Sequence, residues 1–153
     1  MCKLGLNKEE VNLSVSVLSD MLKEQFMLFG NILNVHWNIE GQNFIALHQL
    51  LKHHYEFVKT CCDDIAERIR VFGVKAPAQQ SQNVKDANIT EIDEHNEVGD
   101  FIYCLTSDYE KVICYIRTTI IELSSSNDFG TRSLLENQLL NYEKIHWELI
   151  SNR

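Results

Sequence analysis

The sequence predicts an all-α protein, a four-helix bundle with one long crossover between the second and third helices. Apolar residues recur three and four positions apart in four long segments, which is the spacing of one face of an α-helix. The chain contains a single proline and six glycines, so few positions interrupt a helix. Its 153 residues predict a single domain over residues 1–153.

The four helices are expected over residues 8–38, 43–72, 95–123 and 130–150. Gly73 and Pro77 follow the second helix and are typical of a helix end. The first two helices are separated by a few residues, as are the last two, so each pair should form an antiparallel hairpin. Residues 78–94 are polar and aperiodic, with one short helical turn expected at 84–87. This segment is long enough to cross the length of the bundle, which is the ferritin-like arrangement.

Charge, hydropathy and cysteine content exclude several classes of function. The chain carries 22 acidic and 14 basic residues, a formal net charge of −8, and it has no basic run that would bind the phosphates of DNA. The longest uncharged run in the first half, residues 26–39, is shorter than the roughly 20 apolar residues of a membrane helix. The N-terminal residues lack the apolar core of a signal peptide. Five cysteines without a Cys-x-x-Cys pair favour a reducing cytoplasm.

Two stretches hold side chains that could bind a metal ion. His36 and His48 flank the expected connection between the first two helices, and Asp63 and Glu67 follow in the second helix. Residues four apart lie on one face of a helix, so the two carboxylates repel each other unless a cation lies between them. The alternative is a solvated acidic face on which neighbouring arginines, Arg68 and Arg70, are the partners.

Helical geometry places these four side chains outside the core of one bundle. With about 100° per residue, His48 falls about 20°, Asp63 about 80° and Glu67 about 120° beyond the edge of the apolar stripe of the second helix. An oxidase with two irons inside one bundle needs inward-facing carboxylates and two Glu-x-x-His motifs. The chain has one such motif, Glu143 to His146, which we interpret as helix surface.

Helix length adds a second constraint. His48 and Asp63 are 15 residues apart, about 22 Å along a helix, whereas bonds from nitrogen or oxygen ligands to a metal are about 2 Å. The two groups cannot bind one ion within one chain. Cooperation requires two antiparallel chains, with His36 and His48 of one facing Asp63 and Glu67 of the other, and a two-fold axis would create two such sites.

The combination of His36-Trp37-Asn38, His48 and Asp63-x-x-x-Glu67-Arg68 resembles the signature of the Dps family, the bacterial mini-ferritins. The resemblance implies a cytoplasmic hollow shell of twelve subunits that oxidises Fe(II), preferably with hydrogen peroxide, and stores ferric mineral as protection against oxidative stress. It also implies that His36, His48, Asp63 and Glu67 are the iron ligands and the catalytic ferroxidase residues. Trp37 beside the site is either a sink for stray oxidising equivalents or a packing residue.

Two departures from the family pattern limit what the resemblance implies. Position 52, one turn after His48, is usually acidic in the family and completes a second metal position, but here it is Lys52. Some members bind DNA through a lysine-rich N-terminal tail, which this chain lacks, so we expect protection by iron chemistry and not by coating DNA. The same Lys52 motivates a rival hypothesis, a metal-free helical scaffold that keeps the assembly.

The other polar candidates are expected to be structural. His53 should face solvent, His54 should lie at the edge of the core, and His95 should open the third helix. Cys104 and Cys114 are interpreted as core or near-core residues. Asp128, in the last loop, is a candidate for the lining of an ion-entry pore in the assembled shell. The sequence leaves open whether peroxide or oxygen is the oxidant, how many irons bind, and whether other metals occupy the site.

Overall fold

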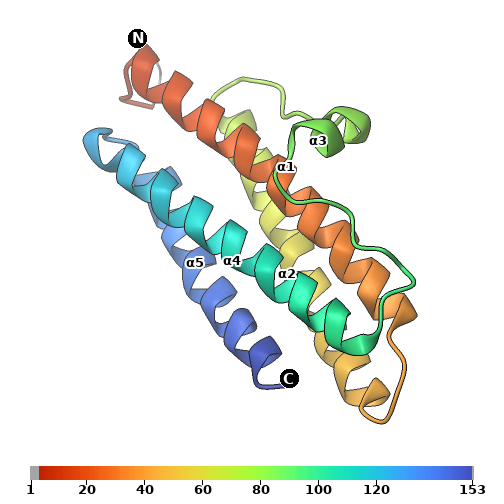
Figure 1. Cartoon of the computed structure of the whole chain (residues 1–153). Coiled ribbons are helices and arrows are strands. Elements are labelled where there is room, and N and C mark those ends of the chain that lie inside the picture. The colour runs from red at the N-terminus through yellow and green to blue at the C-terminus, as the bar shows by residue number, and fades with distance from the viewer. Residues whose placement is uncertain (1–3, 153) are drawn as a thin grey trace.

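The computed structural model describes residues 4–152 and consists of four long helices with a short fifth helix in the crossover (Figure 1). The N-terminal Cys2 and Lys3 lie outside the described residues. The elements are α1 Lys8–Asn38, α2 Phe44–Val71, α3 Gln80–Asp86, α4 Val98–Glu122, a 3-10 turn Leu123–Ser125, and α5 Phe129–Ile150.

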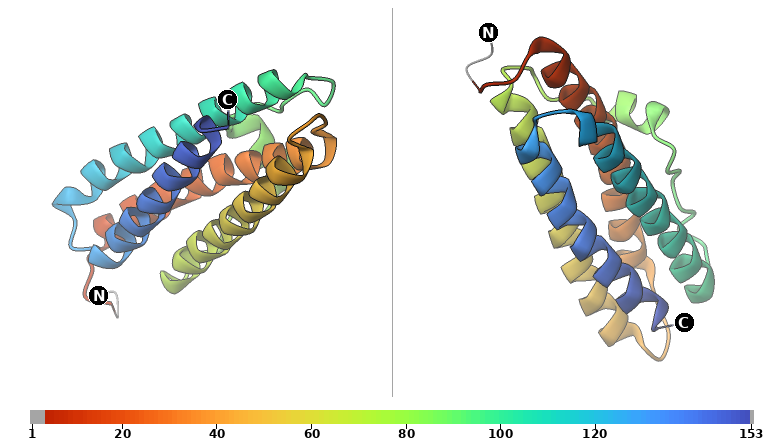
Figure 2. Two further views of the ribbon diagram at one scale, coloured as in Figure 1. Left: turned by 90° about the horizontal axis from the view of Figure 1, so that it is seen from below. Right: turned by 90° about the vertical axis from the view of Figure 1, so that its left-hand side faces the viewer.

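The arrangement of the helices is the one that the connection lengths predict. Helices α1 and α2 form one antiparallel hairpin and α4 and α5 form the other, and the crossover with α3 runs back along the outside of α1 (Figures 1 and 2). Within the bundle, α1 also packs against α4, and α2 against α5. The prediction of an all-α, ferritin-like bundle with a long crossover between the second and third long helices is therefore confirmed.

Several helix boundaries differ from the sequence prediction: α2 is one residue shorter at each end and α4 ends one residue early, at Glu122. The third long helix begins at Val98 and not at residue 95, because the Asp93 side chain accepts a hydrogen bond from the His95 backbone N–H at 2.9 Å and closes a turn there. The crossover helix covers Gln80–Asp86 and so begins four residues before the expected turn. Helix α5 begins one residue early, at Phe129, because Asp128 is its N-cap.

The core is formed by the apolar stripes of all four long helices. Near the middle of α1 and α5 it includes one amide pair, in which Gln25 Nε2 donates to Gln138 Oε1 at 2.9 Å. The rest of the core consists of buried apolar side chains, of which those that are fully buried include Leu18, Leu28, Ile32, Leu51, Ile65, Ile69, Leu105, Ile116, Leu135 and Leu149. None of the helices within residues 4–152 has the length and apolar character needed to span a membrane.

Asp128 connects three helices at one end of the bundle. Its carboxylate accepts hydrogen bonds from Ser14 Oγ of α1 at 2.6 Å and from the backbone N–H of Thr131 in α5 at 3.0 Å. It also forms an ion pair with the Arg68 guanidinium of α2 at 2.6 Å. Asp128 is only 2% exposed, so the expectation that it lines an ion pore is wrong: its oxygens are already used to hold the helices together.

We expect Asp128→Ala to lower the free energy of unfolding by about 3–5 kcal/mol, because Arg68 would lose its buried partner. Urea denaturation at fixed protein concentration measures the change. The matched control is Asp20→Ala, which removes an exposed ion pair with Lys23 and should cost less than about 1 kcal/mol. Equal effects of the two substitutions would contradict the assigned role of Asp128.

Candidate metal centre

The tight connection between α1 and α2 brings His36 and His48 together. Helix α1 ends at Asn38 and α2 begins at Phe44. Gly41 between them has a φ of 107°, a conformation that other residues rarely adopt, and its carbonyl accepts a hydrogen bond from the Phe44 N–H at 3.1 Å. The two imidazole rings stack with centroids 3.8 Å apart and an interplanar angle of 17°.

Reciprocal hydrogen bonds fix the tautomers of both histidines. His36 Nδ1 lies 2.9 Å from the His48 carbonyl oxygen, and His48 Nδ1 lies 2.9 Å from the His36 carbonyl oxygen. A carbonyl only accepts, so each Nδ1 donates its proton, and in the neutral ring Nε2 keeps a lone pair. Burial, followed by the charges of His48 and Lys52, lowers the pKa of His36. A neutral imidazole with Nδ1 hydrogen-bonded is the form of histidine that binds metal ions.

Aromatic rings surround this histidine pair. Tyr55 packs edge-on against His36, with centroids 5.2 Å apart, and Phe44 lies 5.0 Å from the His48 ring. These contacts restrict the orientation of both imidazoles. Trp37 is 68% exposed, so it does not pack into the core of its own chain.

Asp63 and Glu67 form an exposed acidic pair without a neutralising partner. Both side chains lie on the surface of α2, and within residues 4–152 neither makes an ion pair. The neighbouring Arg68 is bound to Asp128, and Arg70 donates to a backbone carbonyl at 2.9 Å. The alternative in which these arginines neutralise the acidic face is therefore not what the structure contains.

A groove runs beside Asp63 between α1 and α2. Its volume is about 610 Å³, and Phe26 and Phe29 of α1 together with Cys62 and Ala66 of α2 form part of its wall. The groove is open, so Asp63 is accessible from outside the chain. An acidic residue at the edge of an apolar groove is a suitable place for contact with a second molecule.

A single chain does not bring the two halves of the predicted ligand set together. Asp63 and Glu67 lie in the same unbroken helix as His48, which keeps the 15-residue separation at about 22 Å. Within the described part of the chain, these four residues do not form a group with ligand atoms close to one another. The joint site of His36, His48, Asp63 and Glu67 stays a prediction that depends on a second chain.

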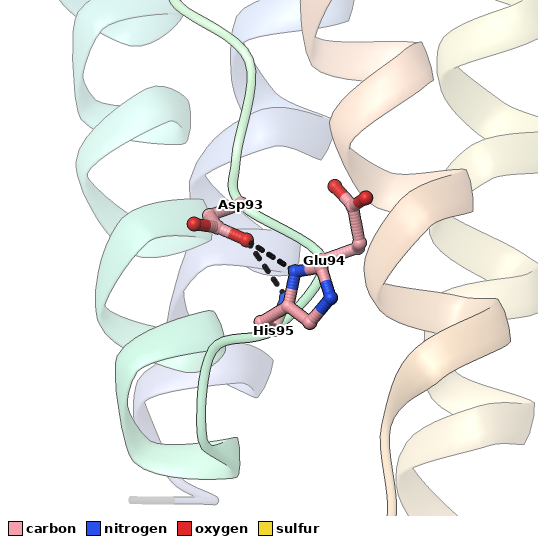
Figure 3. A group of neighbouring side chains, drawn as sticks. All are labelled: Asp93, Glu94 and His95. Carbon is pink, nitrogen blue, oxygen red and sulfur yellow. Dashed lines mark hydrogen bonds and ion pairs between the residues drawn. The ribbon is translucent and has the colours of Figure 1, made fainter.

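One cluster of ligand-type residues was not predicted from the sequence. Asp93, Glu94 and His95 in the crossover have ligand atoms within 4.8 Å of one another (Figure 3). All three are exposed, and Asp93 accepts hydrogen bonds from both the backbone N–H and Nδ1 of His95. The three residues are adjacent in the sequence, so the run itself could have been noticed there. The hydrogen bonds between Asp93 and His95 shape the loop before α4.

The two other histidines of α2, His53 and His54, differ in their surroundings. His53 is exposed, whereas His54 is 1% exposed and its Nδ1 lies 3.1 Å from the Tyr109 hydroxyl. The His54 Nε2 atom has no hydrogen-bond partner, and the nearest carboxylate oxygen, of Glu148, is 3.8 Å away. Burial therefore lowers the pKa of His54 to about 4.

The Glu-x-x-His motif of α5 lies on the helix surface, as predicted. Glu143 forms an ion pair with Arg117 of α4, and His146 Nε2 lies 3.1 Å from the Glu110 carboxylate. Within residues 4–152, the only group of three or more ligand-type residues is the exposed crossover cluster. In the described part of the bundle interior, no three ligand-type side chains come together, so the structure gives no support to the intra-bundle oxidase alternative.

Comparison with known proteins agrees with this fold. A model of the ferritin-like domain matches residues 15–151. The chain belongs to the ferritin-like domain family. DNA protection during starvation protein 2 of Bacillus anthracis is 27% identical over 135 residues, which cover 88% of this chain and 92% of the relative. The resemblance to the Dps family that the histidine and carboxylate motif predicts is confirmed, since homologues of this ferritin-like protein are Dps proteins.

Solved structures show the same relationship. A Dps structure from Mycobacterium smegmatis has a TM-score of 0.90 and 26% sequence identity, and the match covers 97% of this chain and 90% of that one. DpsC from Streptomyces coelicolor has a TM-score of 0.95 at 21% identity, covering 99% and 90% of the two chains. At that identity the second likeness concerns the fold alone.

The pKa of His54 predicts acid destabilisation of this ferritin-like protein. Between about pH 6.5 and pH 4, His54 is protonated in the unfolded chain and neutral in the folded chain. The free energy of unfolding should therefore fall by up to about 3 kcal/mol as the pH is lowered through this range. In His54→Gln this part of the pH dependence should disappear, whereas His53→Gln should retain it. Urea denaturation at a series of pH values measures the difference. Identical pH profiles for wild type and His54→Gln would contradict the prediction.

Proposed function

We propose that this protein is a ferroxidase and iron-storage protein. It binds Fe(II) between two chains related by a two-fold axis, oxidises it with hydrogen peroxide, and stores the ferric product inside a hollow shell of twelve subunits in the cytoplasm. The iron ligands are His36 and His48 of one chain with Asp63 and Glu67 of the other. The observation that carries the proposal is the histidine pair, whose Nδ1 atoms are both bound to carbonyls and whose Nε2 atoms remain free to bind a metal.

The acidic pair supports the second half of this site. Asp63 and Glu67 are one turn apart, exposed and without an ion pair among the described residues, because Arg68 is bound to Asp128. Two unneutralised carboxylates attract a cation. An antiparallel partner brings this pair to the histidine end of α2, and a two-fold axis then gives two equivalent sites per dimer.

The ligand set suits the oxidation of iron. Carboxylate oxygens stabilise Fe(III) more than Fe(II), and neutral imidazoles hold the ion without adding charge. Binding at such a site therefore lowers the free energy of the oxidised product relative to the reactant. The iron is the substrate of the reaction, and it leaves the site as ferric mineral.

Exposed apolar side chains support assembly beyond the dimer. Trp37, Ile45, Tyr103, Ile121 and Trp147 are each at least 60% exposed in the single chain. Large apolar side chains on a surface are typical of contacts between subunits. Twelve subunits would have a mass of about twelve times 17.8 kDa.

The name of the Bacillus anthracis relative refers to DNA protection, and in this protein we propose that protection acts through iron chemistry. The formal net charge of −8 opposes binding to phosphates. Lys52 favours the rival hypothesis of a metal-free scaffold, because its positive charge lies one turn after His48. The two hypotheses differ in whether Fe(II) is oxidised at all.

A double substitution tests the site. Anaerobic Fe(II) followed by hydrogen peroxide should give ferric absorbance in the wild type, and His36→Ala with Asp63→Ala should slow its appearance more than about tenfold, because both halves of the site lose a ligand. The matched control is His53→Ala with Asp64→Ala, which changes exposed neighbours of the same residue types. Unchanged oxidation in the first variant would eliminate the site, and a wild type without ferric absorbance would favour the scaffold.

Mixed assemblies test whether two chains share the site. Subunits carrying His36→Ala and His48→Ala should be inactive alone, as should subunits carrying Asp63→Ala and Glu67→Ala. When the two are refolded together, half of the dimers are mixed and one of the two sites in each is intact, so about one quarter of the wild-type activity should return. Ligands supplied within one chain would give no recovery, and that result would contradict the shared site.

A further inference from the structure

We propose that Tyr55 supplies the second electron when peroxide is reduced at the proposed iron site, so that one Fe(II) and one tyrosine are oxidised together. This inference rests on the proposed function. It concerns the region around the histidine pair, where Lys52 and Tyr55 follow His48 at intervals of four and three residues in α2. Residues spaced in this way lie on one face of a helix.

The residues around the histidine pair suit a single iron. Each proposed site has four ligand residues, two histidines from one chain and two carboxylates from the other. The side chain one turn after His48 is the ammonium of Lys52, which repels a second cation at that position. With one Fe(II) bound, the site itself holds only one electron for the oxidant.

Hydrogen peroxide requires two electrons for its reduction to water. A single Fe(II) gives one, and the transfer of only that electron releases a hydroxyl radical. The balanced alternative takes the second electron and a proton from a phenol: Fe(II), hydrogen peroxide, tyrosine and one free proton taken up from the solvent give Fe(III), a tyrosyl radical and two water molecules. The O–O bond breaks, iron and tyrosine are each oxidised by one electron, and peroxide is reduced.

Tyr55 is the oxidisable side chain in contact with the proposed ligands. Its ring packs edge-on against His36 with centroids 5.2 Å apart and an interplanar angle of 70°. Phe29 packs against Tyr55 from α1, with centroids 6.4 Å apart. Tyr55 is half-buried, and among residues 4–152 its hydroxyl has no hydrogen-bond partner, so its proton is free to pass to water.

The other aromatic residues near the histidines are less suitable. Phe44 contacts His48 but has no hydroxyl to oxidise. Trp37 is 68% exposed and, in the part of the chain that the structure describes, makes no ring contact with either histidine. The geometry therefore favours Tyr55 over Trp37 as the electron donor.

The test uses the assembled protein loaded anaerobically with one Fe(II) per site and mixed with one equivalent of hydrogen peroxide. Rapid freezing and electron paramagnetic resonance should detect a tyrosyl radical, and ring-deuterated tyrosine should narrow that signal. One peroxide should be consumed for each iron. In Tyr55→Phe, which keeps the ring against His36, the tyrosyl signal should be lost. Because the single Fe(II) then supplies only one electron, a spin trap should detect hydroxyl radical in this variant.

Two further variants separate the alternatives. Tyr103→Phe removes an exposed tyrosine of α4 and should leave the tyrosyl signal unchanged, and Trp37→Phe should also retain it. A tyrosyl signal that persists in Tyr55→Phe, or a signal that is lost in Trp37→Phe, would overturn the inference. Ferric absorbance without any radical in the wild type would overturn the inference and leave the proposed function intact. The absence of ferric absorbance would overturn both.

Discussion

The length and continuity of α2 is the constraint on which the proposed site depends. The helix runs without a break from Phe44 to Val71, so it holds His48 and Asp63 about 22 Å apart. No rearrangement of side chains closes such a distance. If the proposed ligands are correct, each chain carries half of the site near either end of one helix, and an antiparallel neighbour would have to supply the other half.

The packing of the bundle determines the surroundings of the histidine pair and of the acidic pair. At one end, Gly41 turns the chain tightly enough for His36 and His48 to exchange hydrogen bonds with each other's carbonyls. At the other end, the buried Asp128 binds Arg68 and so removes the cation that would otherwise neutralise Glu67 and Asp63. The same ion pair that stabilises the contact among α1, α2 and α5 therefore leaves the acidic pair free.

Polar groups inside the bundle have structural roles. The amides of Gln25 and Gln138 bind each other near the middle of the core, and His54 contacts Tyr109 as a neutral base. A buried carboxylate cluster in this position would bind metal within one chain. Its absence from the interior of the described bundle agrees with a site that forms on the surface of α2.

The sequence alone determined the number of long helices, their approximate bounds, the crossover and the face of α2 on which Asp63 and Glu67 lie, because helical periodicity and connection length are local properties. It did not determine where α4 begins, since that depends on a turn closed by the Asp93 side chain. Only the tertiary structure decided that Asp128 is buried and not part of a pore, that Arg68 binds Asp128, and that the rings of His36 and His48 stack. Each of these outcomes depends on contacts between residues far apart in the chain or on the orientation of side chains. The spacing of residues along the sequence determines neither the contacts nor the orientations.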